Sequence, residues 1–79
     1  MRPAAYEVRA TVVARAAPGL LLVRHAAVSA FGMEAMETMA LEAGPETLDA
    51  AGLAPGDRVR VAVRRDGDRF RVVWIERER

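Results

Sequence analysis

The fold is decided most clearly by residues 58–77, which read RVRVAVRRDGDRFRVVWIER. Valines alternate with arginines through Arg58–Arg65, and this period of two predicts a half-buried strand. Asp66-Gly67-Asp68 is a turn signal that joins this strand to a second one, Phe70–Arg77, as a hairpin. The large side chains predicted to share the core-facing side of the second strand are Phe70, Val72 and Trp74.

A second hairpin is predicted near the N-terminus. Apolar and polar residues alternate through Tyr6–Ala16, and Pro18-Gly19 is a turn signal before another strand, Leu20–Ala27. On that strand His25 lies on the same side as Val23. The single histidine of the chain is therefore predicted to stand near the end of a core-facing row.

The middle of the chain is predicted to hold one short helix and one ambiguous segment. Glu46–Ala51 favours a helix that ends at Gly52. Glu34–Ala43 consists mostly of strong helix formers, so propensity alone predicts a helix, although tertiary contacts can override such a preference and produce a strand. Several short strands in 79 residues, without repeats, predict one all-β domain over residues 1–79, closed or nearly closed into a barrel.

The composition argues against several classes of function. There is no cysteine, which excludes a disulfide and a thiolate metal site. The 12 basic residues, all arginine, stand against 11 acidic ones, and the net charge of +1 gives little electrostatic reach toward nucleic acid or anionic lipid. With one histidine, no glycine-rich phosphate loop and no nucleophile–base spacing, we expect no enzyme.

The location of the chain is less constrained. No apolar run approaches the roughly 18 residues of a membrane span, and Met1–Ala5 has no hydrophobic signal segment. We expect a cytoplasmic chain as written, or a mature domain whose signal or anchor lies outside this sequence.

The residues with the most chemistry are His25 and three methionines that follow it, Met33, Met36 and Met39. A neutral imidazole combined with thioethers selects soft monovalent ions such as Cu(I) or Ag(I) over Mg or Ca. Core packing is the alternative, because methionine fills irregular gaps and a lone histidine is commonly a core residue. Trp74 as a cation–π cap on a metal is less favoured than Trp74 as part of the barrel core.

The arrangement of several of these residues resembles a motif of a known protein family. His25, an apolar spacer through Val28 and Phe31, and the run MEAMETM at residues 33–39 resemble the metal-binding segment of the CusF-like periplasmic copper- and silver-binding proteins. Pro55–Val59 resembles the family's connection into its fourth strand. The resemblance implies a five-stranded OB-like β-barrel that binds Cu(I) or Ag(I) near its mouth. It also implies a monomeric periplasmic or other extracytoplasmic metallochaperone that delivers metal to an efflux or assembly protein.

The resemblance also assigns the ligands. His25 matches the imidazole ligand, Met36 and Met39 match two methionines of the family's Met-Thr-Met run, and Met33 matches a position that holds Trp or Met. The family's paired methionines are two residues apart, whereas here they are three apart, as if Glu37 were inserted. Residues three apart do not share a face of a regular strand. A β-bulge around Glu37, or a turn of helix, is needed before Met39 can join the others.

Two other interpretations remain open. OB barrels often bind single strands, and arginines of the last hairpin could form a nucleic-acid face while the methionines serve as core. These arginines are Arg58, Arg60, Arg64, Arg65, Arg69 and Arg71. Interleaved acidic residues and scarce aromatic ones argue against such a face. The other interpretation is a family barrel that has lost metal affinity through the Glu37 insertion.

Overall fold

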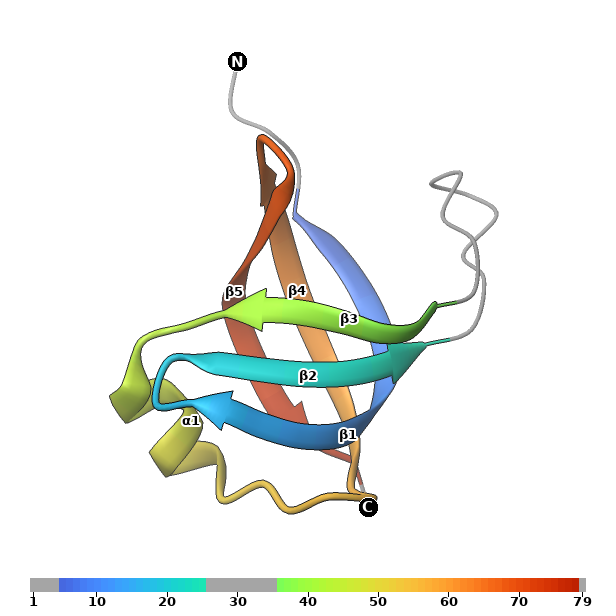
Figure 1. Cartoon of the computed structure of the whole chain (residues 1–79), viewed down its shortest axis with the longest axis vertical. Coiled ribbons are helices and arrows are strands. Elements are labelled where there is room, and N and C mark those ends of the chain that lie inside the picture. Colours follow the sequence, from blue (N-terminus) through green and yellow to red (C-terminus); the bar gives the residue numbers. More distant parts are fainter. Residues whose placement is uncertain (1–4, 26–35, 79) are drawn as a thin grey trace.

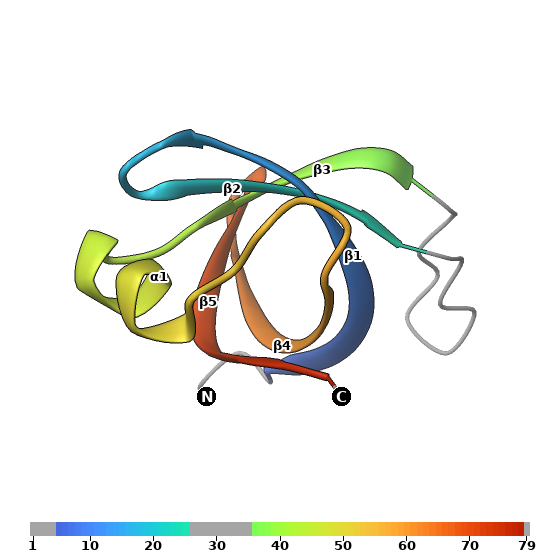
Figure 2. The same cartoon turned by 90° about the horizontal axis from the view of Figure 1, so that it is seen from below.

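The computed structural model describes residues 5–25 and 36–78, and for Met36 and Glu37 it describes the backbone alone. Its elements, in chain order, are β1 (Tyr6–Ala17), β2 (Leu20–His25), β3 (Met36–Glu42), α1 (Pro45–Ala51), β4 (Arg58–Asp66) and β5 (Arg69–Arg77). The strands close into a barrel in the order β1-β2-β3-β5-β4, and β4 pairs back with β1. Figures 1 and 2 show this barrel from the side and from below. The predicted five-stranded all-β barrel with one short helix is confirmed.

The long strand β1 allows the barrel to close. It pairs with β4 along its first half and with β2 along its second half, and Ala10 and Thr11 have partners on both sides. Register shifts against β2 after Val12 and after Arg15 each leave one extra residue in β1. Such bulges bend a strand and increase its twist, and the curvature of β1 is visible in Figure 2.

The barrel interior is almost entirely aliphatic. Alternate residues of the strands point inward, as the period-two pattern predicts, and Leu48 of α1 joins them. The buried core consists of Val8, Ala10, Val12, Leu21, Val23, Met39, Leu41, Leu48, Val59, Val61 and Val63. Burial of these side chains is the main force that closes the barrel, at about 1.5–3 kcal/mol for each large one.

Helix α1 is held beside the β1–β2 turn (Figure 1). It has proline in its first turn and ends at Gly52, whose φ of 63° and ψ of 41° place it in the left-handed region that glycine tolerates best. Arg15 ties the helix to the barrel, because its guanidinium donates to Asp49 Oδ1 at 2.6 Å and to the Pro18 carbonyl oxygen at 2.6 Å. No helix in the described part of the chain is long and apolar enough to cross a membrane.

The helix that propensity predicts over Glu34–Ala43 is wrong for its described part, which is the strand β3. β3 pairs antiparallel with β2 along its length and pairs parallel with β5 at Leu41 and Glu42. A helix here would leave the edges of β2 and β5 without partners, and a closed sheet removes both edges. Pairing on two sides and burial of Leu41 outweigh the modest helix preference of the segment.

The predicted core position of Trp74 is also wrong. Ala62 pairs with Trp74 but Val63 pairs with Val72, so β5 has one extra residue, Val73. This bulge reverses the alternation and turns Trp74 to the outer face, where it is 39% exposed. The guanidinium carbon of Arg60 lies 6.0 Å from the centre of its ring.

Strand β2 ends at His25. Ala26 and Ala27, predicted as the end of this strand, lie outside the described residues, as do Val28, Phe31 and Met33.

Candidate metal centre

His25 occupies an unusual position in this barrel. It is the last residue of β2, it is 4% exposed, and it is the one buried polar or charged side chain among residues 5–25 and 38–78. Alternation along β2 places it on the inner face with Leu21 and Val23, as predicted. The imidazole therefore lies on the inner face of the barrel, at the C-terminal end of β2.

The pairing of β2 with β3 determines where the methionine positions fall. Val23 pairs with Met39, whereas His25 pairs with Met36. Two steps along β2 thus correspond to three steps along β3, and β3 has one extra residue between its two methionines. This register shift is the β-bulge near Glu37 that the three-residue spacing requires.

The bulge allows the two methionine positions, three residues apart, to belong to the same face of the sheet. Residues that face each other across an antiparallel pair lie on the same side of the sheet. Val23 and His25 both belong to the inner face, so the register positions of Met39 and Met36, opposite them, belong to that face too. A regular strand would have given the two methionine positions opposite faces.

The three methionines differ in what the structure describes. Met39 is 2% exposed and packs within the aliphatic core opposite Val23, so it contributes to the core whether or not it also binds a metal. Met36 stands opposite His25 in the register, with its backbone alone described. Met33 lies outside the described residues.

The donors available here suit a soft metal. Across the described residues, no group of three or more His, Cys, Asp and Glu side chains comes together to hold a metal. The inner face instead supplies one imidazole and one buried thioether, with a second methionine position opposite the imidazole. Neutral nitrogen and sulfur donors in apolar surroundings favour Cu(I) or Ag(I) over ions that require several oxygen ligands.

The family comparison matches nearly the whole barrel. A family model described as "Copper binding periplasmic protein CusF" matches residues 5–77. The chain belongs to the CusF family. This confirms the family expected from the His–Met spacing, a family whose description names copper.

Solved structures agree with the fold. The CusF-family chain superimposes on apo-CusF from Escherichia coli with a TM-score of 0.81 and 18% identity, covering 99% of this chain and 92% of that one. It superimposes on Ag(I)-bound CusF from Escherichia coli with a TM-score of 0.70 and 19% identity, covering 99% of this chain and 96% of that one. A comparison with curated protein sequences gave no match.

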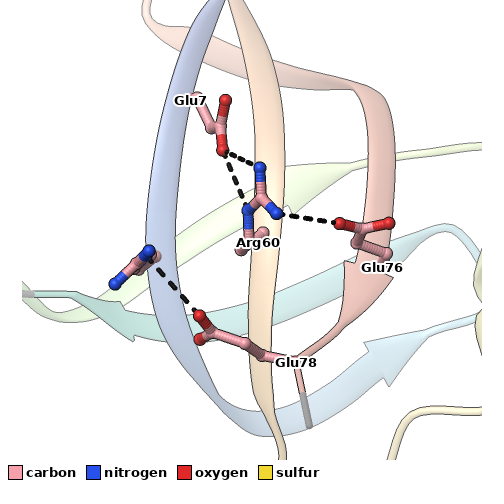
Figure 3. Close-up of polar contacts among 5 residues, drawn as sticks. Glu7, Arg60, Glu76 and Glu78 are labelled. Atoms are coloured by element: carbon pink, nitrogen blue, oxygen red, sulfur yellow. Dashed lines mark hydrogen bonds and ion pairs between the residues drawn. The ribbon is translucent and has the colours of Figure 1, made fainter.

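On the outer face of the barrel, some arginines of the last hairpin pair with carboxylates from other strands. Arg60 lies between two carboxylates, Glu7 Oε1 at 2.6 Å and Glu76 Oε1 at 3.3 Å (Figure 3). The hydrogen bond and charge of Glu7 raise the pKa of Arg60 above its usual value. Arg69 is paired similarly, with Glu42 Oε1 at 3.5 Å. Two of the arginines considered for a nucleic-acid face are therefore engaged with carboxylates, which the spacing within one hairpin did not indicate.

Trp74 is not placed to cap a metal bound by His25. The indole lies on the outer face over Arg60, whereas His25 lies on the inner face. The sequence also disfavours a cap, but the assumption of strict alternation through Val72–Trp74 wrongly placed Trp74 in the core. The adjacent pair Val72-Val73 was the available signal, since two consecutive valines before a large side chain are compatible with a bulge.

Proposed function

We propose that this chain binds Cu(I) or Ag(I) through His25 and its methionines and transfers the ion to a protein partner in the periplasm. Family membership supports the metal and the compartment, since the matched family is described as copper binding and periplasmic. The Ag(I)-bound neighbour has the same fold as this chain. The observation that carries the proposal is the register of β3, which sets Met36 opposite the buried His25.

The ligands have distinct roles in this proposal. His25 supplies the nitrogen donor and Met36 the first sulfur donor, because their positions are paired across β2 and β3. Met39 supplies a second sulfur from one pair deeper in the barrel. Met33, which lies in the segment between the two strands, supplies the remaining donor.

The donor set also favours transfer of the ion. Thioethers have no proton to lose and form weaker bonds to the metal than thiolates, so one ligand can be exchanged for a partner's ligand at a time. The imidazole must be neutral to bind, so acid should weaken binding through His25 alone. We infer a monomeric binding protein and no catalytic activity.

Titration with Cu(I) against a chromogenic competitor tests the ligand set. His25→Phe and Met36→Leu remove the donor atoms and keep apolar bulk, so each variant should lose at least tenfold in affinity, about 1.4 kcal/mol. Leu22→Met is the matched control, because Leu22 lies on β2 between the buried Leu21 and Val23 and faces away from the barrel interior. This variant should bind Cu(I) as the parent does. Parent-like affinity in both donor variants would contradict the proposal.

A further inference from the structure

A pocket of about 400 Å³ lies on the outer face of the barrel, across β1, β2 and β4. Its lining residues are Arg9, Ala10, Thr11, Arg24, Arg58 and Glu78. We call it the arginine pocket. The strand register explains the cluster: Thr11 pairs with Arg24 on one side and with Arg58 on the other, so two guanidinium groups flank one hydroxyl group. Arg9 precedes Thr11 by two residues and shares its face.

The arginine pocket has more positive than negative charge. Glu78 is the one carboxylate among the described residues that line it, and Glu78 Oε1 lies 3.6 Å from Arg9 Nε. Arg24 and Arg58 form no ion pair with any side chain that the structure describes. Arg60, on the same outer face, contrasts with them, since its guanidinium lies between Glu7 and Glu76 (Figure 3).

The arginine pocket lies directly outside the candidate metal centre. Arg24 immediately precedes His25, and alternation sends the two side chains to opposite faces of β2, one exposed and one buried. Ala10, which lines the pocket, is the β1 partner of His25. Whatever binds to the arginine pocket is therefore positioned at the end of the barrel where β2 stops.

We propose that the arginine pocket binds paired carboxylates from an acidic segment of the protein that exchanges metal with this chain. This inference rests on the proposed function. Guanidinium groups recognise carboxylates through paired, charge-assisted hydrogen bonds, and three of them around one hydroxyl can hold two carboxylates. Attraction between opposite charges also speeds and orients the encounter of two proteins, which a transfer protein needs.

The surroundings favour a peptide over a nucleic acid. Among the residues that the structure describes, no aromatic side chain lines the pocket, so they offer bases no stacking platform there. The exposed Trp74 is covered by Arg60, and the nearby carboxylates of Glu7 and Glu76 would repel a phosphate chain running along this face.

Glu78 has a separate role in this proposal. Its backbone N–H donates to the Arg58 carbonyl oxygen at 2.7 Å, which keeps the end of β5 against the start of β4. Its carboxylate, paired with Arg9, stands in for one partner carboxylate and has to be displaced when the partner binds. Removal of that charge should therefore strengthen binding, while loss of an arginine should weaken it.

Fluorescence anisotropy of a labelled hexaglutamate peptide, at low ionic strength, tests the proposal. Arg24→Gln and Arg58→Gln should each weaken binding about threefold to fivefold, and Glu78→Gln should strengthen it by a similar factor. Arg64→Gln is the matched control, since it removes the same charge from an exposed position of β4 outside the pocket. Equal losses in Arg64→Gln and Arg58→Gln, or no gain in Glu78→Gln, would overturn the proposal.

Two further probes distinguish other occupants. If short oligothymidylate binds the parent more tightly than hexaglutamate does, the pocket belongs to nucleic acid. If inorganic phosphate displaces the peptide when both are present at the same total concentration of negative charge, the pocket belongs to small anions. Either result would overturn the proposal. Cu(I) affinity is measured separately in the parent and in Arg58→Gln. A parent protein that binds the peptide but not Cu(I) would contradict the proposed function alone. A parent protein that binds Cu(I) but not the peptide would contradict the arginine-pocket proposal alone.

Discussion

Among the described residues, His25 and Met39 are the two buried ones that are also candidate metal ligands. Both lie on the inner face within the same part of the β2–β3 pair, and both are almost completely enclosed. A buried imidazole among aliphatic side chains costs free energy unless its polar atoms are satisfied. A buried methionine costs nothing of this kind, because its thioether packs as well as an alkyl chain. Function and packing are therefore easier to separate at Met39 than at His25.

Substitutions of Met39 separate its two roles. Met39→Leu keeps the core volume, so it should change the free energy of unfolding by less than about 1.5 kcal/mol. Met39→Ala opens a cavity and should cost about 2–5 kcal/mol. If Met39 is a ligand, both variants lose Cu(I) affinity; urea unfolding and Cu(I) titration measure the two effects. Full affinity in a stable Met39→Leu protein would leave Met39 with its core role only.

Trp74 allows a second test at single-residue scale. Its ring lies outside the barrel over Arg60, so bound Cu(I) should leave its emission nearly unchanged. Arg60→Gln removes the cation over the ring and should alter the emission without altering Cu(I) affinity. Strong quenching of the parent by Cu(I), absent in His25→Phe, would show that the metal and the indole are in contact.

Among the elements, β3 connects the fold to the site. Its C-terminal part, around Leu41, pairs with both β2 and β5 and closes the barrel. Its N-terminal part has the extra residue that puts Met36 opposite His25 and Met39 opposite Val23. One strand thus has a regular end that serves stability and a bulged end that serves the candidate site.

Changes in the length of β3 test this division. Deletion of Glu37 restores a two-residue spacing, and a regular strand then keeps both methionine positions on the inner face, so Cu(I) affinity should stay within about threefold of the parent. A glycine inserted after Glu37 sets the two methionine positions four residues apart, so a regular strand keeps them on one face but moves Met36 two positions away from its place opposite His25, and affinity should fall about tenfold or more. A large loss on deletion together with no loss on insertion would show that the bulge does not determine the ligand geometry.

At the scale of the whole molecule, the barrel is small and has no covalent cross-link. Its 79 residues include no cysteine, and its core is aliphatic, so the stability margin rests on packing and closure. A metal that binds β2 and β3 from the inside joins two strands of the wall. Binding to the folded state alone must raise the stability of the barrel.

Thermal unfolding with and without Ag(I) measures that gain. At a free Ag(I) concentration of about 100 times Kd, folding should gain about 2.7 kcal/mol, which is several degrees or more in Tm for a domain of this size. The gain should shrink as pH falls, because a protonated imidazole cannot bind the ion, and it should be small in His25→Phe at every pH. A gain in Tm that is independent of both pH and His25 would indicate binding elsewhere on the protein.

Most of the strands, both hairpin turns and the short helix could be predicted from the sequence alone. These features depend on local patterns: alternation in residues 58–65, Asp66-Gly67-Asp68 in the last turn, and Gly52 after α1. The candidate soft donors His25, Met33, Met36 and Met39 were also predicted from the sequence, because imidazole and thioether groups are recognised by residue type without coordinates.

Contacts between strands, which no local pattern contains, set the state of β3, the register position of Met36 and the faces of Met39 and Trp74. Local propensity favoured a helix at β3, and the pairing needs of β2 and β5 overcame it. A single extra residue reverses every side chain that follows it in a strand, and whether a bulge forms depends on the neighbouring strand. The bulges near Glu37 and at Val73 therefore placed Met39 inside and Trp74 outside; the sequence is compatible with both bulges, but the neighbouring strands decide whether they form.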